Sequence, residues 1–187
     1  MKGIVFTEFL QLVEEKFGYD MVDKLLLIAK PENEGAYTAV GTYDHTELIQ
    51  LVVTLSKEID AEVSDLVKLF GGFLFKKFSA AYSDLIFSNV DNSFDFLENV
   101  DGYIHGEVRK LYPGAELPVF EYNRPDDQTL EVLYKSSRPF ADLCEGLMGA
   151  CISHFGEDIE VEREDLSHDG TSAKFTLVRQ PANCLNS

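Results

Sequence analysis

The spacing of the apolar residues changes once along this chain, at Pro118, and that change limits the possible folds more than any other feature. Before Pro118, apolar residues recur every three or four positions, as they do in helices that bury one side. After it, alternation of apolar and polar residues indicates strands over 119–122, 130–136, 159–164 and 174–179. The sequence therefore predicts an α+β fold, in which a helical N-terminal part precedes a four-stranded antiparallel sheet with one helix.

Most of the predicted helices lie before Pro118, and one lies between the second and third strands. The periodicity places them over 3–17, 19–30, 44–58, 61–78, 80–88, 93–111 and 140–155. Asp44 should cap the third helix, and residues 181–187 should form a frayed tail. No linker divides the chain, so we expect a single domain over 1–187. Within it, a helical part over about 1–60 and a second part over about 61–180 should share a core.

A histidine, His105, stands near the end of the predicted helix over 93–111. It lies at the edge of an apolar side formed by Leu97, Val100, Ile104, Val108 and Leu111. Gly102 and Gly106 flank it, and each costs about 1 kcal/mol in a helix relative to alanine, so a packing reason is expected. A histidine in such a place is most often an ordinary packed residue. One imidazole cannot build a zinc site, but it can be the single protein ligand of a haem iron.

Three hydrogen-bond donors are spaced by two residues where the second predicted strand leads into a loop: Tyr134, Ser136 and Arg138. In an extended chain, side chains two positions apart share one face. The guanidinium fork of arginine suits a carboxylate. The row therefore suits an anion with two carboxylates, such as the propionates of haem. The alternative is an ordinary polar strand face.

Together these segments resemble the haem-nitric oxide/oxygen-binding (H-NOX) domains, which include bacterial gas sensors and the haem domain of soluble guanylate cyclase. The resemblance rests on the MKG start, the His105 helix, the LYPGAELP that follows it and the spacing Tyr134-x-Ser136-x-Arg138. It implies a haem b between the helical part and the sheet part, with His105 as the proximal ligand of the ferrous iron. It also implies that Tyr134, Ser136 and Arg138 hold the propionates and that Pro118 bends the porphyrin.

The resemblance also suggests which residues face the side of the haem where a gas binds. They are Val5, Phe9, Leu74 and Leu143, and we expect Ile104 and Leu147 to contact the haem as well. Oxygen-binding members carry a tyrosine at the position of Leu143 and polar residues at those of Phe9 and Leu74. Bound oxygen gains from a hydrogen-bond donor, whereas nitric oxide binds tightly without one. The expected function is therefore a nitric oxide sensor that discriminates against oxygen. Carbon monoxide is a further expected ligand, and an oxygen sensor of the same fold is the alternative.

The resemblance further implies how the signal leaves the haem. Nitric oxide should weaken the bond between iron and His105, and release of the histidine should let the helical part rotate against the sheet part. Gly71 and Gly146 match the family's pivot, although the pair Gly71–Gly72 equally fits tight helix packing. The output should be another protein, for which the family suggests a histidine kinase or a cyclic-di-GMP enzyme.

Charge and motifs exclude several other classes of function. A net charge of −17, from 33 acidic and 16 basic residues, argues against nucleic acid and anionic membrane surfaces as partners. No apolar run reaches the roughly 20 residues of a membrane helix, and three glutamates interrupt any signal-like start, so a cytoplasmic protein is expected. Motifs of hydrolases, metalloproteases and P-loop enzymes are missing, so we do not expect an enzyme.

The cysteines leave two further alternatives. Cys144, Cys151 and Cys184 suggest no disulfide framework, and Cys144, Cys151 and His154 lack the fourth ligand of a structural zinc site, so no zinc is expected. One alternative is a cofactor-free regulatory or ligand-binding module, in which His105 is an ordinary boundary residue. The other is a redox sensor, which requires Cys144 or Cys151 to be exposed with a lowered pKa.

Overall fold

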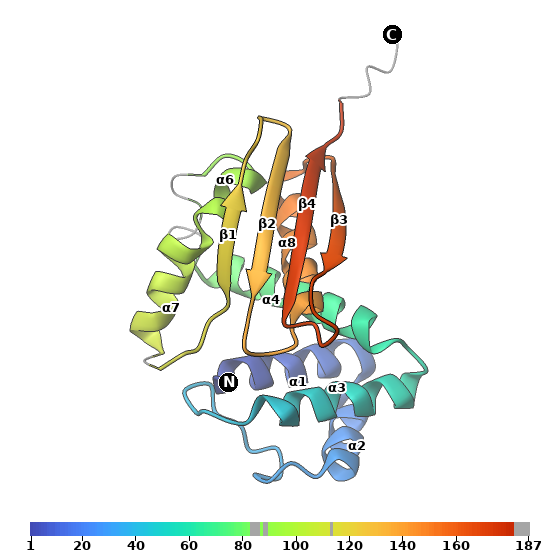
Figure 1. Ribbon diagram of the computed structural model, residues 1–187. Helices are drawn as coiled ribbons and strands as arrows, with labels where there is room; N and C mark the ends of the chain where they lie inside the picture. Colours follow the sequence, from blue (N-terminus) through green and yellow to red (C-terminus); the bar gives the residue numbers. More distant parts are fainter. Residues whose placement is uncertain (83–86, 88–89, 113, 182–187) are drawn as a thin grey trace.

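The computed structural model describes residues 1–82, 87, 90–112 and 114–181. Its four antiparallel strands form one sheet in the order β1-β2-β4-β3 (Figure 1). They are β1 (Val119–Asn123), β2 (Thr129–Lys135), β3 (Ile159–Asp165) and β4 (Ser172–Arg179). Every second side chain of β2 is buried, as a period of two predicts. The predicted α+β class and its four strands are thereby confirmed.

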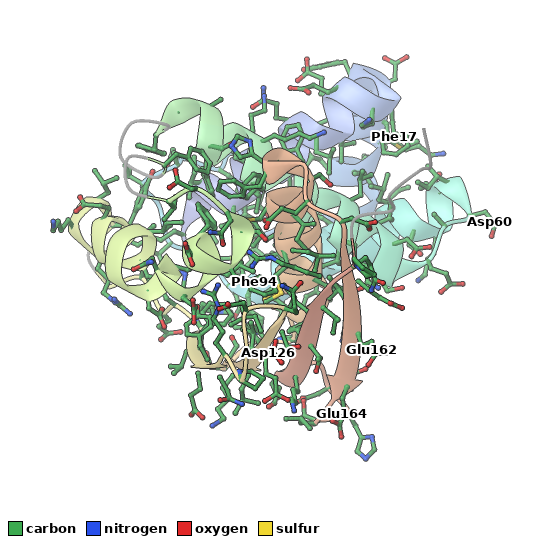
Figure 2. All side chains as sticks on the ribbon, turned by 90° about the horizontal axis from the view of Figure 1, so that it is seen from above. Phe17, Asp60, Phe94, Asp126, Glu162 and Glu164 are labelled. Atoms are coloured by element: carbon green, nitrogen blue, oxygen red, sulfur yellow. The ribbon has the colours of Figure 1, made fainter. Side chains whose placement is uncertain are left out.

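One face of the sheet is covered and the other is exposed. Helix α8 (Ala141–Phe155) packs on the covered face, where its Met148 and Cys151 share a core with Phe175 and Leu177 of β4. Figure 2 shows α8 on one side of the sheet and the exposed acidic residues of β3 away from it. The sheet part is thus a helix-on-sheet layer with one polar face.

Three helices form the helical part at the lower end of the sheet in Figure 1. They are α1 (Gly3–Phe17), α2 (Tyr19–Ala29) and α3 (His45–Ile59). Asp44 caps α3 as predicted, because its carboxylate accepts a hydrogen bond of 2.8 Å from the backbone N–H of Thr46. The core of this part is made largely of Phe6, Phe9, Leu12, Val13, Leu25, Leu48, Leu51 and Leu55.

Helix α4 (Val63–Ala81) joins the two cores. Its Leu66, Phe70 and Leu74 pack with the helical part, whereas Phe75, one residue further on, packs with the sheet part. The sequence assigned this helix to the second part alone, but it serves both. Within the described ranges, none of the helices combines the length and the apolar character needed to cross a membrane.

The backbones of α4 and α8 cross at two glycines. A Cβ atom on Gly146 would lie 2.1 Å from the carbonyl oxygen of Lys68, and one on Gly71 would lie 2.4 Å from that of Leu143. Both are closer than non-bonded atoms approach, so only glycine fits at either position. Gly72 is different, since the nearest atoms to its Cβ position are 3.9 Å away. Tight helix packing therefore explains one glycine of the Gly71–Gly72 pair.

The predicted long helix over 93–111 is wrong in one respect, because it is broken into three pieces. They are α6 (Ser93–Glu98), the π-helix η1 (Val100–Ile104) and α7 (His105–Leu111). The π-turn shifts the side chains after it around the axis. The residues of the expected apolar side still lie on one surface, because all five line the cavity described below: Leu97, Val100, Ile104, Val108 and Leu111. Most of the predicted helix over 80–88, and residues 182–187 of the predicted tail, lie outside the described residues.

Candidate functional site

A cavity of about 790 Å³ lies between the helical part and the sheet part. Its size falls within the roughly 300–1,000 Å³ of sites that enclose cofactors and other small molecules. Its walls include residues of α1, α4, α6, η1, α7, α8, β1, β2 and the segment 114–118. All but one of the predicted site residues line it: His105, Tyr134, Ser136, Arg138, Pro118, Ile104, Val5, Leu74, Leu143 and Leu147.

His105 enters this cavity as the first residue of α7, directly after the π-helix. Its side chain is 12% exposed, and its ring stacks on Phe120 of β1 at 5.8 Å between centroids. Nδ1 donates to the carboxylate of Asp101, one turn earlier, over 2.6 Å. Burial lowers the pKa of His105, although the Asp101 carboxylate acts in the opposite direction. The ring is therefore held as a neutral imidazole whose Nε2 carries the free lone pair that a metal requires.

Predicted donors Tyr134, Ser136 and Arg138 meet at one edge of the cavity, where β2 ends at Lys135. Beyond the strand the chain turns, and the Arg138 backbone N–H donates to the Ser136 hydroxyl over 3.1 Å. The Tyr134 side chain is 2% exposed, and burial raises its pKa to about 12. Its phenol is therefore protonated at neutral pH and able to donate a hydrogen bond.

Arg138 has a partner that the sequence did not reveal. Its Nη1 donates to the backbone oxygen of Glu116 over 2.9 Å, and its Nη2 donates to the carboxylate of the same residue. The Arg138 side chain is 14% exposed, whereas that of Glu116 is 70% exposed. A buried guanidinium at the cavity edge thus already binds one carboxylate.

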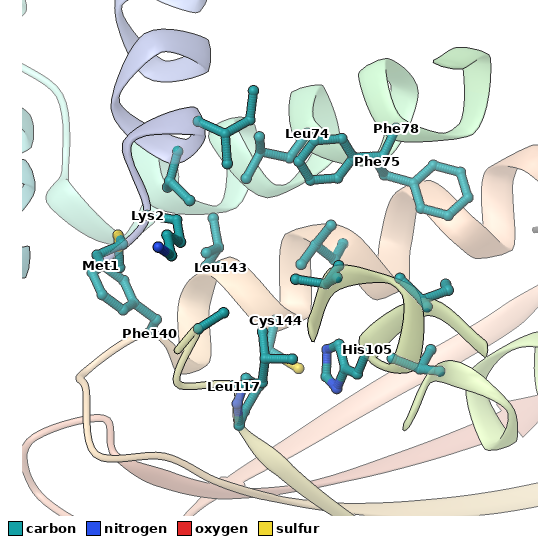
Figure 3. A pocket seen from close by; sticks show the side chains of 18 of the residues that line it. Met1, Lys2, Leu74, Phe75, Phe78, His105, Leu117, Phe140, Leu143 and Cys144 are labelled. Atoms are coloured by element: carbon teal, nitrogen blue, oxygen red, sulfur yellow. The ribbon is translucent and has the colours of Figure 1, made fainter. Parts of the chain in front are cut away.

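Hydrocarbon side chains form the wall across from the histidine. Figure 3 shows Leu74 of α4 on the side of the pocket opposite His105, and Leu143 of α8 projecting into the space between. Val5 of α1 and Leu147 of α8 also line the cavity. None of these four side chains can donate a hydrogen bond.

Phe9, the remaining predicted residue, does not line the cavity. It is fully buried in the helical core, edge-on to Phe70 at 5.3 Å. The reason is its place one turn further along α1 than Val5, where α1 faces α4 instead of the cavity. Glu8 lines the cavity unexpectedly, and its buried Oε2 has no hydrogen-bond partner among the described residues. Glu8 therefore brings one polar side chain to the lining of the cavity beside Val5.

The two described cysteines lack the exposure that a reactive thiol needs. Cys144 is 6% exposed and Cys151 is fully buried, and burial raises the pKa of both thiols well above their usual range. The redox-sensor alternative needed an exposed thiolate, so it finds no support at either residue. Within the described ranges, no three histidine, cysteine, aspartate or glutamate side chains gather as metal ligands.

The donor set of the cavity fits a haem. A flat, mostly apolar cofactor with one axial position and two carboxylates needs one neutral imidazole, hydrocarbon walls and a cluster of donors at one edge. His105 supplies the neutral imidazole. Hydrocarbon lining comes from Val5, Leu74, Leu143 and Leu147, and the donors at the edge come from Arg138 and its neighbours.

Solved structures of other proteins show the same fold. The Fe(II) unliganded H-NOX protein from K. algicida is 38% identical, with all of both chains covered and a TM-score of 0.91. The IWP-051-bound H-NOX from Shewanella woodyi, in the Fe(II)CO state, is 42% identical, covers 100% of this chain and 98% of its own, and gives a TM-score of 0.83. An H-NOX protein from S. oneidensis in the Fe(II)NO state is 25% identical over 97% of this chain and 100% of its own, with a TM-score of 0.87.

Sequence comparisons agree. Soluble guanylate cyclase gcy-35 from Caenorhabditis elegans is 25% identical over 141 residues, which are 74% of this chain and 20% of that protein. This chain therefore matches about a fifth of the length of that relative. The family model described as Haem-NO-binding matches residues 2–163. The chain belongs to this family of H-NOX haem gas-sensor domains.

Proposed function

We propose that this protein binds nitric oxide at a ferrous haem b, discriminates against oxygen, and passes the signal to a partner protein. The observation that carries the choice of gas is that the cavity residues at the expected gas-binding side, Val5, Leu74 and Leu143, and the neighbouring Leu147 are all hydrocarbon side chains. Oxygen bound to ferrous iron draws negative charge and needs a donor for stability, whereas nitric oxide does not. Carbon monoxide, which needs no donor either, should also bind.

Each side chain at the site then has a defined task. Haem supplies the ferrous iron at which a diatomic gas binds. His105 would ligate that iron through Nε2, and Asp101 holds the ring in the required orientation and tautomer through its 2.6 Å hydrogen bond. Arg138, Ser136 and Tyr134 would hold the propionates at the edge of the cavity. Ile104 and Pro118, which line the cavity, would pack on the porphyrin.

The signal is proposed to arise from release of His105 when nitric oxide binds. A released histidine would free the segment of η1 and α7 that carries it, and the helical part would shift against the sheet part. Gly71 and Gly146 hold α4 and α8 in backbone contact, and this crossing would serve as the pivot. A ligand drives such a shift only by its difference in affinity for the two arrangements. A histidine kinase or a cyclic-di-GMP enzyme is the proposed receiver.

Two variants at one position test the gas selectivity. Leu143→Tyr places a phenol on the hydrocarbon wall, and Leu143→Phe places the same ring there without the hydroxyl. Visible absorption of the ferrous proteins in air should show oxygen binding in Leu143→Tyr, and neither in wild type nor in Leu143→Phe. Oxygen binding by the wild type, or equally by both variants, would refute the donor argument.

The release model has its own test. His105→Gly, with haem retained by added free imidazole, should place the partner in its nitric-oxide-bound state of activity whether or not the gas is present. Activity of the partner, assayed with both forms, is the readout. Partner activity equal to that with the unliganded wild type would rule out release as the signal.

A further inference from the structure

The pairing of Arg138 with Glu116 has a consequence for any carboxylate that reaches this edge of the cavity. Two of the guanidinium nitrogens are bonded to Glu116, one to its backbone oxygen at 2.9 Å and one to its side-chain carboxylate. The backbone bond fixes where the guanidinium lies. The side-chain bond occupies a donor of the fork with the same chemical group that a propionate would present.

Exposure decides which partner of this pair can move. Arg138 is 14% exposed and its backbone N–H is tied to Ser136, so the guanidinium is held in place. Glu116 is 70% exposed and lies on the segment 114–118 between α7 and β1, so its carboxylate can turn into water. An ion pair whose carboxylate lies mostly in solvent is weak, so the exchange costs little.

We propose that Glu116 is a built-in competitor for the carboxylate site at Arg138, and that a propionate binds there by displacing its side chain. This inference rests on the proposed binding of haem. Glu116 then lowers the affinity for the cofactor and couples the occupation of Arg138 to the segment that connects His105 with Pro118. The backbone bond from Nη1 to Glu116 can persist, so displacement releases the side chain without unfastening the segment.

The test follows loss of haem from the full-length protein into an excess of apomyoglobin, by visible absorption. Glu116→Gln removes the competing charge and should slow the loss of haem about two- to fivefold, the range set by a weak, exposed ion pair. Glu121→Gln is the matched control, because Glu121 is a 58% exposed carboxylate on β1 that pairs with Lys135 at 2.7 Å. It removes one negative charge of the sheet part and should leave the rate unchanged.

Two further arms separate competition from general repulsion between negative charges. Haem dimethyl ester carries no ionised carboxylate, so Glu116→Gln should leave its rate of loss unchanged. In an Arg138→Ala background the site of competition is gone, so Glu116→Gln should also leave the loss of ordinary haem unchanged.

The outcomes distinguish this inference from the proposed function. Equal rates of haem loss from wild type and Glu116→Gln, or faster loss from the variant, would refute the proposed competition. Either result would leave the proposed binding of haem intact. An effect of Glu116→Gln that survives in the Arg138→Ala background also overturns it, because it marks a long-range charge effect. A wild-type protein that takes up no haem overturns both.

Discussion

Gly146 offers a quantitative test of the helix crossing on which the site is built. A Cβ atom at this position would lie 2.1 Å from the Lys68 carbonyl oxygen, whereas ordinary contact begins at 3.4 Å. Gly146→Ala therefore requires α4 and α8 to separate by about 1.3 Å, because the opposing atom is backbone and cannot turn aside. Overpacking of this kind costs about 1–3 kcal/mol.

Gly149→Ala is the matched control for that substitution. Gly149 is an exposed residue of the same helix, and no atom lies within 4 Å of its Cβ position. Alanine gains about 1 kcal/mol over glycine in a helix at either position. The difference between the two variants therefore isolates the steric cost.

Urea unfolding of both variants, followed by far-ultraviolet circular dichroism, measures this difference in the free energy of unfolding. Gly149→Ala should be more stable than wild type by up to about 1 kcal/mol. Gly146→Ala should be less stable than Gly149→Ala by about 1–3 kcal/mol. Equal stability of the two variants would refute the close crossing and, with it, the proposed pivot.

Three other predictions concern single groups at the site. Asp101→Asn removes the charge that supports the His105 imidazole, so loss of haem to apomyoglobin should accelerate about tenfold; an unchanged rate would count against this support. The Tyr134 phenol has a pKa of about 12 when folded, above the ordinary value near 10. The contribution of this protonated phenol to stability is complete below pH 10 and is lost as the pH rises towards 12. Tyr134→Phe should therefore reduce the fall in urea-measured stability over that interval by up to about 2–3 kcal/mol. Identical pH profiles of the two proteins would contradict the shift. Cys144 and Cys151 should resist a thiol reagent until the protein unfolds, as peptide mass mapping can check, and labelling of either in the folded protein would contradict their burial.

Periodicity was enough to predict the fold class and most elements. Strands are indicated by alternating apolar and polar residues. In β2 every second residue is buried because only one face of the strand packs on α8. The π-helix before His105 was beyond this reasoning. A five-residue π-helix has the same kind of apolar residues as an α-helix, and only the backbone hydrogen-bond pattern distinguishes the two.

The sequence predicted most residues of the site but not the hydrogen-bond partners of His105 and Arg138. The spacing of Tyr134, Ser136 and Arg138 identified a cluster of donors, and the structure brings it to the same cavity as the histidine. Asp101 could have been found, since a carboxylate four residues before a histidine lies on the same helical face. Glu116 could not, because the conformation of a loop decides which carboxylate reaches Arg138.

The position of Phe9 could not be predicted from the spacing of apolar residues. The apolar side of α1 faces the cavity at Val5 and the helical core at Phe9, and both need the same type of residue. Hydrophobic spacing therefore predicts that a side chain is buried, but not which of two apolar surroundings it enters.

The visible absorption spectrum of the purified ferrous protein, recorded without gas, in air and with nitric oxide, tests the central claim most directly. We predict a haem absorption band that shifts with nitric oxide and not with oxygen, because His105 is proposed to ligate the iron while Val5, Leu74, Leu143 and Leu147 offer no hydrogen-bond donor to a bound gas. A colourless protein would contradict the haem site, and a stable shift in air would contradict the selectivity.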